Sequence, residues 1–195
     1  MFTNNISRSI EFVEIAYFWN SFGVDVHIFE LQKHLLPVED EDCSKEIEKA
    51  YKKYGIKQSL GIEKISAKST KKEVVFSVTE NGEQKEYKFE KGLIAVGMTG
   101  NVEGIGLENA GIEVDRGFIK VDGMQRTSAP GVYAIGDVSG GKLLAHAASH
   151  EGVIAAEHLS GENPHALNND QVAGCTYCQP QVASIGKTEK QLKDE

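Results

Sequence analysis

The stretch that decides the fold reads Thr127-Ser128-Ala129-Pro130-Gly131-Val132-Tyr133-Ala134-Ile135-Gly136-Asp137. Pro130 fixes φ and Gly131 permits an unusual φ, so the first part predicts a turn. The apolar run 132–135 predicts a short strand. Asp137 then follows at the carboxyl end of that strand, where open α/β sheets bind their ligands. Its carboxylate can accept a hydrogen bond from a ribityl or ribose hydroxyl, or it can cap the next turn.

The spacing Thr-x5-Tyr-Ala-Ile-Gly-Asp resembles the second flavin-binding motif of flavoproteins with two dinucleotide-binding domains. With Leu143-Leu144-Ala145-His146 shortly after it, the sequence resembles the dihydrolipoyl dehydrogenases, which are pyridine nucleotide–disulfide oxidoreductases. The resemblance implies that Asp137 contacts the ribityl chain of FAD and that the backbone of 143–146 contacts the flavin ring. It assigns no acid/base role to His146. Without the resemblance, His146 would be interpreted as a polar residue at a helix start.

Composition narrows the class of protein. The chain has 195 residues, with 21 basic against 29 acidic side chains, which makes nucleic acid or an anionic membrane an unfavourable partner. No apolar run approaches the roughly 20 residues of a membrane span, and the first residues lack the apolar centre of a signal peptide. The three cysteines form no disulfide framework, so we expect a reducing, cytoplasmic setting.

The N-terminal part predicts the second half of a dinucleotide-binding βαβ unit. Apolar residues recur at helical spacing over 10–22, Gly23 suits a helix end, and 24–29 predicts a strand that ends at Glu30. In such a unit the terminal acid binds the ribose 2′- and 3′-hydroxyls, and its charge repels a 2′-phosphate. Glu30 therefore indicates NAD rather than NADP, although an acid at a strand end can also be merely solvated. The family alignment makes Glu14 a further cofactor contact.

The glycine-rich fingerprint Gly-x-Gly-x-x-Gly is missing before that helix. The alignment puts Ser7, Ser9 and Phe12 at the three glycine positions, where small residues admit the pyrophosphate and close packing. We therefore expect a truncated or frame-shifted N-terminus, a hypothesis that the upstream DNA would test.

The middle of the chain predicts a helix over 43–54 and then an antiparallel meander. Strands are expected at 62–68, 73–79 and 85–96, with Asn81-Gly82 as a hairpin turn. By resemblance, Gly97 at the end of the last strand lies against NAD, and Ile65 lies near the adenine. The glycines in 104–111 have the wrong spacing for a phosphate loop and predict a connector containing a short helix.

Toward the C-terminus, 117–122 predicts a strand and 144–159 a helix with a small-residue face, on which His150 and Glu151 are interpreted as surface residues. The segment from Cys175 to Gly186 resembles the first strand of the family's interface domain. Cys175 and Cys178 have Cys-x-x-Cys spacing, but no second pair completes a zinc site. A metal or redox role is therefore the less favoured interpretation.

The predicted fold class is α/β: a Rossmann-like three-layer NAD-binding domain with an inserted antiparallel meander, a partial FAD-domain segment, and the start of an α+β interface domain. The expected domains are 1–115 for NAD, 116–165 for the second FAD segment and 166–195 for the interface domain. The expected cofactors are FAD and NAD. The expected partners are a second copy of the chain and the lipoyl domains of 2-oxoacid dehydrogenase complexes.

Two catalytic features of the family have no counterpart in the sequence: the Cys-x4-Cys redox pair and the C-terminal His-Glu pair. We therefore expect an internal fragment of a dihydrolipoyl dehydrogenase that carries binding residues and no catalytic ones. The alternatives are a mercuric or glutathione-type reductase, a dinucleotide-binding module without catalysis, and a reductase for iron–sulfur proteins. The segment 175–186 disfavours the last of these.

Overall fold

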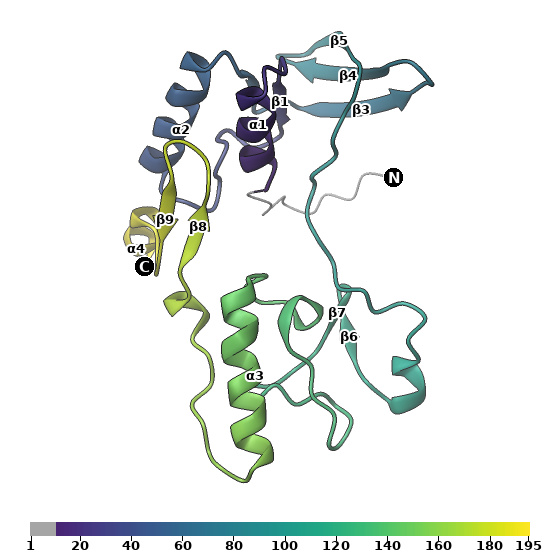
Figure 1. Ribbon diagram of the computed structural model, residues 1–195, viewed down its shortest axis with the longest axis vertical. Coiled ribbons are helices and arrows are strands. Elements are labelled where there is room, and N and C mark those ends of the chain that lie inside the picture. The colour runs from purple at the N-terminus through teal and green to yellow at the C-terminus, as the bar shows by residue number, and fades with distance from the viewer. Residues whose placement is uncertain (1–10) are drawn as a thin grey trace. The chain divides into compact units, whose positions relative to one another are not determined.

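The computed structural model describes residues 11–195, which divide into two compact units (Figure 1). The first unit joins the chain up to residue 97 with 175–195, and the second comprises 98–174. The domain boundaries expected from the sequence stay a prediction.

The first unit begins with alternating helices and strands. α1 spans Glu11–Ser21, β1 His27–Glu30, α2 Glu41–Lys53 and β2 Lys57–Leu60. β1 and β2 pair in parallel, with His27 opposite Lys57 and Glu30 opposite Leu60. The predicted helices are confirmed, and Gly23 ends the first one with a φ of 83°. The strand starts at His27, later than expected.

Two helices and two strands of this unit share one apolar core. Its buried members are Val13, Ala16, Val26, Ile28, Leu35, Leu36, Ile47, Tyr51, Ile56 and Cys178. Tyr51 on α2 is fully buried, and its hydroxyl donates a hydrogen bond to the Val13 carbonyl of α1 over 2.7 Å. Burial raises the pKa of the Tyr51 phenol above its usual value, and the Cys178 thiol beside it acts in the same direction. This buried polar contact fixes α1 against α2.

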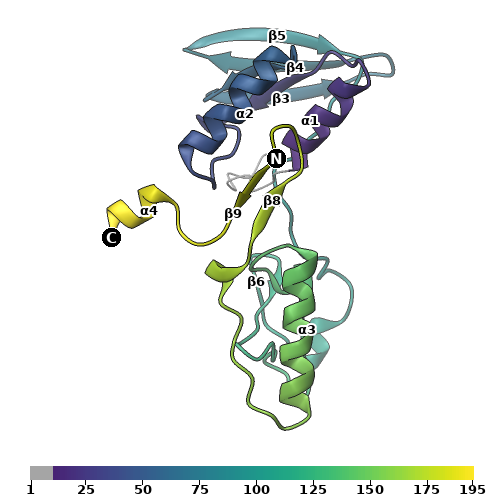
Figure 2. The same ribbon diagram turned by 60° about the vertical axis from the view of Figure 1, so that its left-hand side comes forward.

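The predicted meander is confirmed. β3 spans Lys64–Ser69, β4 Val74–Glu80 and β5 Glu83–Phe89, all antiparallel (Figure 1). Asn81 and Gly82 have φ of 51° and 76°, as the tight hairpin requires. An aromatic cluster of Phe29, Phe76, Tyr87 and Phe89 packs the meander against β1. Figure 2 shows α1 and α2 on the same side of the meander.

The expectation that one strand continues to Val96 is wrong. β5 ends at Phe89, which pairs with Val74, the first residue of β4, so the ladder has no further partner in β4. Gly92 then passes over the Phe76 ring, where a Cβ would lie 2.5 Å from its Cζ atom. The run 93–96 belongs to none of the sheets among the described residues, and Ile94 and Val96 are exposed.

The C-terminal segment of this unit also differs from the expected single strand. β8 (Gly174–Thr176) and β9 (Val182–Ser184) form a two-stranded sheet, and α4 follows at Glu189–Asp194. The loop between the strands carries Cys178 into the core. α4 begins with a capping box between Thr188 and Gln191.

The second unit contains few regular strands. β6 (Val114–Asp115) and β7 (Phe118–Ile119) form a short antiparallel pair, the 3₁₀ helix η1 spans Leu107–Ala110, and η3 spans Asn169–Gln171. Of the strand expected at 117–122, only β7 is present. Among the described residues, the segment 132–135 pairs only through a single bridge between Arg126 and Tyr133. The 3₁₀ helix η2 (Gly136–Ser139) contacts α3 (Ala145–Leu159), which confirms the helix predicted there.

Among the described residues, no helix is both long enough and apolar enough to cross a membrane.

Replacing Tyr51 with Phe tests the contact between α1 and α2. The ring remains and only the buried hydroxyl is lost, so we expect the free energy of unfolding to fall by about 1 kcal/mol. Chemical denaturation of the two proteins measures this difference. The control is Tyr54→Phe on the neighbouring, 42% exposed tyrosine, which should change stability much less. Equal effects of the two substitutions would contradict a special role for the Tyr51 hydroxyl.

Candidate functional site

The first group of candidate residues includes Glu30, at the carboxyl end of the parallel pair β1–β2. Its side-chain Oε1 accepts a hydrogen bond from the backbone N–H of Gln32 over 2.8 Å, and its own carbonyl accepts one from Ile62. The turn after β1 therefore holds the carboxylate in place where both strands end. This is the edge at which parallel α/β sheets bind ligands.

Glu30 is 8% exposed, which is unusual for an unpaired acid. Burial raises the pKa of its carboxyl, and the hydrogen bonds from the backbone of Gln32 and Leu31 partly oppose that shift. A carboxylate in this position has acceptor capacity beyond one amide, because each oxygen carries two lone pairs. Its environment favours additional hydrogen-bond donors such as hydroxyl groups.

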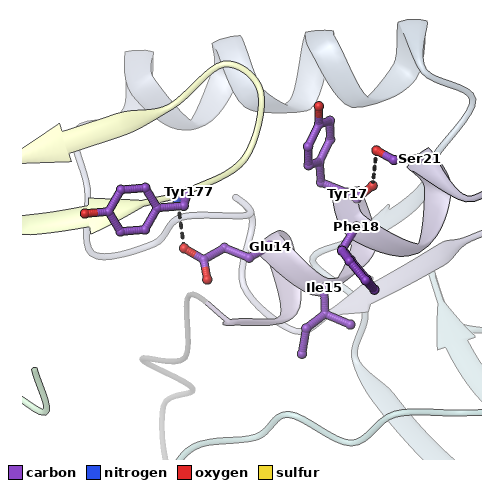
Figure 3. A pocket seen from close by; sticks show the side chains of 6 residues that line it. All are labelled: Glu14, Ile15, Tyr17, Phe18, Ser21 and Tyr177. Carbon is purple, nitrogen blue, oxygen red and sulfur yellow. Dashed lines mark hydrogen bonds between the residues drawn. The ribbon is translucent and has the colours of Figure 1, made fainter. Parts of the chain in front are cut away.

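Glu14 lines a separate, mainly apolar cavity of about 410 Å³ next to α1 (Figure 3). Its Oε1 accepts a hydrogen bond from the backbone N–H of Tyr177 over 2.6 Å, so α1 and the β8–β9 loop meet at this carboxylate. The lining residues are Glu14, Ile15, Tyr17, Phe18, Ser21 and Tyr177. A carboxylate among aromatic side chains can receive a planar, polar or cationic ring. Tyr177 was not identified from the sequence, because its contact with Glu14 spans 163 positions.

Ile65 and Gly97 occupy different surroundings in the same unit. Ile65 on β3 pairs with Val78 and packs, partly buried, against the core of the meander. Gly97 is exposed and has a φ of 117°, a backbone conformation that favours glycine. Close backbone approach by a ligand is therefore possible at Gly97, while Ile65 mainly supports the meander.

Asp137 is in the second unit, in the first turn of η2. The turn closes through Gly140 N–H to the Asp137 carbonyl over 3.2 Å, and Ser139 donates to the Gly136 carbonyl over 2.8 Å. The Asp137 side chain is exposed, and its carboxylate accepts no hydrogen bond from the described residues. It therefore does not cap the turn and is available to a ligand.

The segment 143–146 forms the start of α3 in the same unit as Asp137. Leu144 is the N-cap and supplies no side-chain cap, so the N–H groups of the first turn lack intrahelical acceptors. Such a helix start attracts oxygen atoms of a ligand. The His146 Nε2 atom lies 2.9 Å from the carbonyl oxygen of Ala173, to which it donates. Because this hydrogen bond occupies the Nε2 atom, that atom is not free to act as an acid or base toward a ligand.

The interpretation of Glu151 as a surface residue is wrong. His150 is exposed, but Glu151 is only 5% exposed, and its Oε2 accepts a hydrogen bond from the Gly136 N–H over 2.6 Å. The buried side of α3 consists of Ala147, Glu151, Ile154 and Ala155, while Val153 and Leu159 are exposed. The helical spacing of 147, 151 and 154 could have predicted that these three residues lie on one side of the helix.

The cysteines form no metal site in the part of the chain that the structure describes, which contains no suitable group of His, Cys, Asp and Glu. Cys175 is partly buried, and Cys178 is buried with its thiol donating to the Pro180 carbonyl. Burial raises the pKa of the Cys178 thiol, which disfavours the reactive thiolate. Of the three positions aligned with the fingerprint glycines, Ser7 and Ser9 lie outside the described residues. Phe12 packs against the first core.

A family model for pyridine nucleotide-disulphide oxidoreductases matches residues 13–152. A dihydrolipoyl dehydrogenase of Zymomonas mobilis is 42% identical over 185 residues, covering 94% of this chain and 40% of the relative. A dihydrolipoyl dehydrogenase of Bacillus subtilis is 42% identical over 183 residues, covering 93% and 39%. The chain thus spans about two-fifths of the length of these relatives.

Two solved structures are also similar to this chain. LpdA from Mycobacterium tuberculosis superposes with a TM-score of 0.85 at 28% identity, covering 95% of this chain and 40% of its own. The flavoprotein disulfide reductase RclA from Escherichia coli, in a Cu(II) complex, has a TM-score of 0.83 at 28% identity, covering 97% and 42%. Both similarities extend over nearly the whole chain.

Replacing Glu30 with Gln tests the cost of burying its carboxylate. A raised folded-state pKa means that the native state binds more protons than the unfolded state, so stability falls as pH rises from the ordinary glutamate pKa of 4.5 through the folded-state pKa. Gln keeps an acceptor for the Gln32 N–H and carries no charge. We expect Glu30→Gln to raise the free energy of unfolding at pH 7 and to have little effect at pH 4.

Denaturation at the two pH values measures the difference. The matched control is Glu63→Gln, since Glu63 also accepts a backbone N–H, from Gly82, but is exposed. Glu63→Gln should lack the stabilisation at pH 7 that we expect for Glu30→Gln. A loss of stability at pH 7 in Glu30→Gln would contradict the expected cost of burying its carboxylate.

Proposed function

The chain belongs to the pyridine nucleotide-disulphide oxidoreductase family, and we propose that it provides the dinucleotide-binding part of a dihydrolipoyl dehydrogenase. That enzyme is flavin-dependent and NAD-linked, and oxidises dihydrolipoamide to lipoamide. The observation that carries the proposal is the buried Glu30 carboxylate at the carboxyl end of two parallel strands. The named relatives support the same activity over most of the chain.

In this proposal the first unit belongs to a Rossmann-like three-layer domain that binds NAD. Glu30 accepts the hydroxyls of the adenosine ribose, and its charge disfavours a 2′-phosphate. Glu14 faces the nicotinamide end, where its cavity has an apolar wall and one carboxylate. Gly97 lets the dinucleotide approach the backbone, and Ile65 lies toward the adenine. The surroundings of Glu30 support this assignment, since a buried acid with spare lone pairs favours hydroxyl donors.

The second unit contributes the return segment of an FAD-binding domain. Asp137 accepts hydrogen bonds from the ribityl chain, and the backbone of 143–146 contacts the flavin ring. The exposed Asp137 carboxylate can accept hydrogen bonds from the ribityl hydroxyls, and the uncapped N–H groups of α3 can donate to the flavin. Bound FAD and NAD supply the hydride and electron transfer, while the residues of this chain bind and orient them. The segment 166–195 would begin the interface domain of a homodimer that acts on lipoyl domains.

A second candidate is a dinucleotide-binding protein without catalysis. The observation that favours it is the cysteine pattern, because Cys43, Cys175 and Cys178 include no Cys-x4-Cys spacing in the 195 residues. A mercuric or glutathione-type reductase is less favoured, since Glu30 suits NAD.

Nucleotide binding can be measured with the single tryptophan, Trp19, which lies on α1 five residues after Glu14, about 8 Å along the helix. NADH absorbs in the range of tryptophan emission, so we expect NADH to quench Trp19 and NADPH to bind more weakly. Glu30→Gln should reduce the preference for NADH over NADPH about tenfold, because the charge facing the 2′-phosphate is removed. The control Glu90→Gln removes an exposed acid on the segment after β5 and should leave the preference unchanged. No quenching would refute NAD binding by this chain, and equal quenching by both nucleotides would refute the preference for NADH.

A second measurement separates binding from turnover. Purified with added FAD and NADH, the chain should not reduce lipoamide, because it has no Cys-x4-Cys pair to pass electrons to the substrate. It should also retain no flavin, because it carries only the second segment of the flavin site. The intact Bacillus subtilis enzyme, assayed in parallel, serves as the positive control. Measurable lipoamide reduction by this chain would show that its residues suffice for catalysis.

A further inference from the structure

Glu151 is a buried acid that the cofactor contacts proposed above do not use. It lies in the middle of α3, is 5% exposed, and its Oε2 accepts the Gly136 N–H over 2.6 Å. A hydrogen bond from an amide to a carboxylate at this distance belongs to the stronger class of protein hydrogen bonds. The contact ties the helix to the residue directly before Asp137.

The backbone around Asp137 has little conformational preference of its own. Gly136, Gly140 and Gly141 have φ of 74°, 78° and 73°, and glycine populates both signs of φ with similar ease. A carboxylate placed between such residues can point in many directions unless other groups hold the backbone. Local contacts within the turn, from Ser139 and Gly140, close it but do not orient it relative to the helix.

The structure assigns Glu151 as the positioning residue for Asp137: its buried carboxylate accepts the N–H of the Ile135–Gly136 peptide and so fixes the backbone directly before Asp137 against α3. This inference rests on the proposed flavin contact of Asp137 for its functional meaning. The geometric part stands independently, on the contact between Glu151 and Gly136 and on the exposure of Asp137.

Two substitutions of Glu151 test the positioning. Glu151→Gln keeps an acceptor oxygen, whereas Glu151→Leu has similar bulk and leaves the Gly136 N–H without its acceptor. In the full chain, hydrogen exchange at the amides of Gly136 and Gly140 should quicken about tenfold or more in Glu151→Leu. It should stay near the wild-type rate in Glu151→Gln. The control is Glu157→Leu on the same helix, which should leave both amides protected.

The Gly136 amide also gives a spectroscopic signature of the contact. Its proton resonance should lie downfield in the wild type and move upfield in Glu151→Gln, because a neutral amide accepts a weaker hydrogen bond than a carboxylate. Unchanged exchange at Gly136 in Glu151→Leu would overturn the proposal. If that variant does not fold, the Glu151→Gln spectrum decides: an unmoved Gly136 resonance also overturns it.

Added FAD links positioning to the flavin contact. FAD at millimolar concentration should shift the amides of 136–140, and Glu151→Leu should reduce the apparent affinity about tenfold when Asp137 is present. In the Asp137→Ala background the same substitution should have almost no further effect, because its influence acts through Asp137. A full additional loss in that background would overturn the positioning role. Absence of any FAD shift in the wild type would refute the flavin contact, while the exchange result still decides the positioning.

Discussion

The hydrogen bond from the Tyr51 hydroxyl to the Val13 carbonyl is the contact on which the arrangement of the first unit depends. It joins α2 to α1 across 38 positions, in a core that also contains Cys178 from the C-terminal segment. Because α1 is held there, Glu14 faces the β8–β9 loop. The turn after β1 separately holds Glu30 where the two parallel strands end. A buried hydroxyl that needs its carbonyl partner allows only one packing of α1 against α2. Apolar contacts alone would define that packing less sharply.

The second unit uses a related device with a carboxylate in place of a phenol. Glu151 reaches from α3 to the amide before Asp137, in a turn rich in glycine. Glycine permits the tight path of the chain but does not select it. The same helix presents uncapped N–H groups at its start, so one element supplies both the ligand-facing donors and the constraint on the neighbouring acid.

Local sequence patterns predicted the elements whose stabilising contacts lie close in the chain. The periodicity of 10–22 and the Asn81-Gly82 pair led to the observed helix and hairpin. The position of Glu30 at a strand end followed from the same reasoning. The prediction that the last meander strand continues to 96 failed because its ladder with β4 ends where Phe89 pairs with Val74, the first residue of β4. Among the described residues, the segment 132–135 forms only the bridge between Arg126 and Tyr133.

By itself the sequence determined the α/β class and the family, because these depend on local pattern and on motif spacing. It also proposed the candidate ligand residues, which stay a prediction. Only the tertiary structure decided which acids are buried and what they hold. Glu151 looks like a solvated helix residue until η2 packs over it, and the Tyr177 contact with Glu14 spans 163 positions. Burial and long-range hydrogen bonds arise from which segments meet in space, a property that no window of neighbouring residues contains.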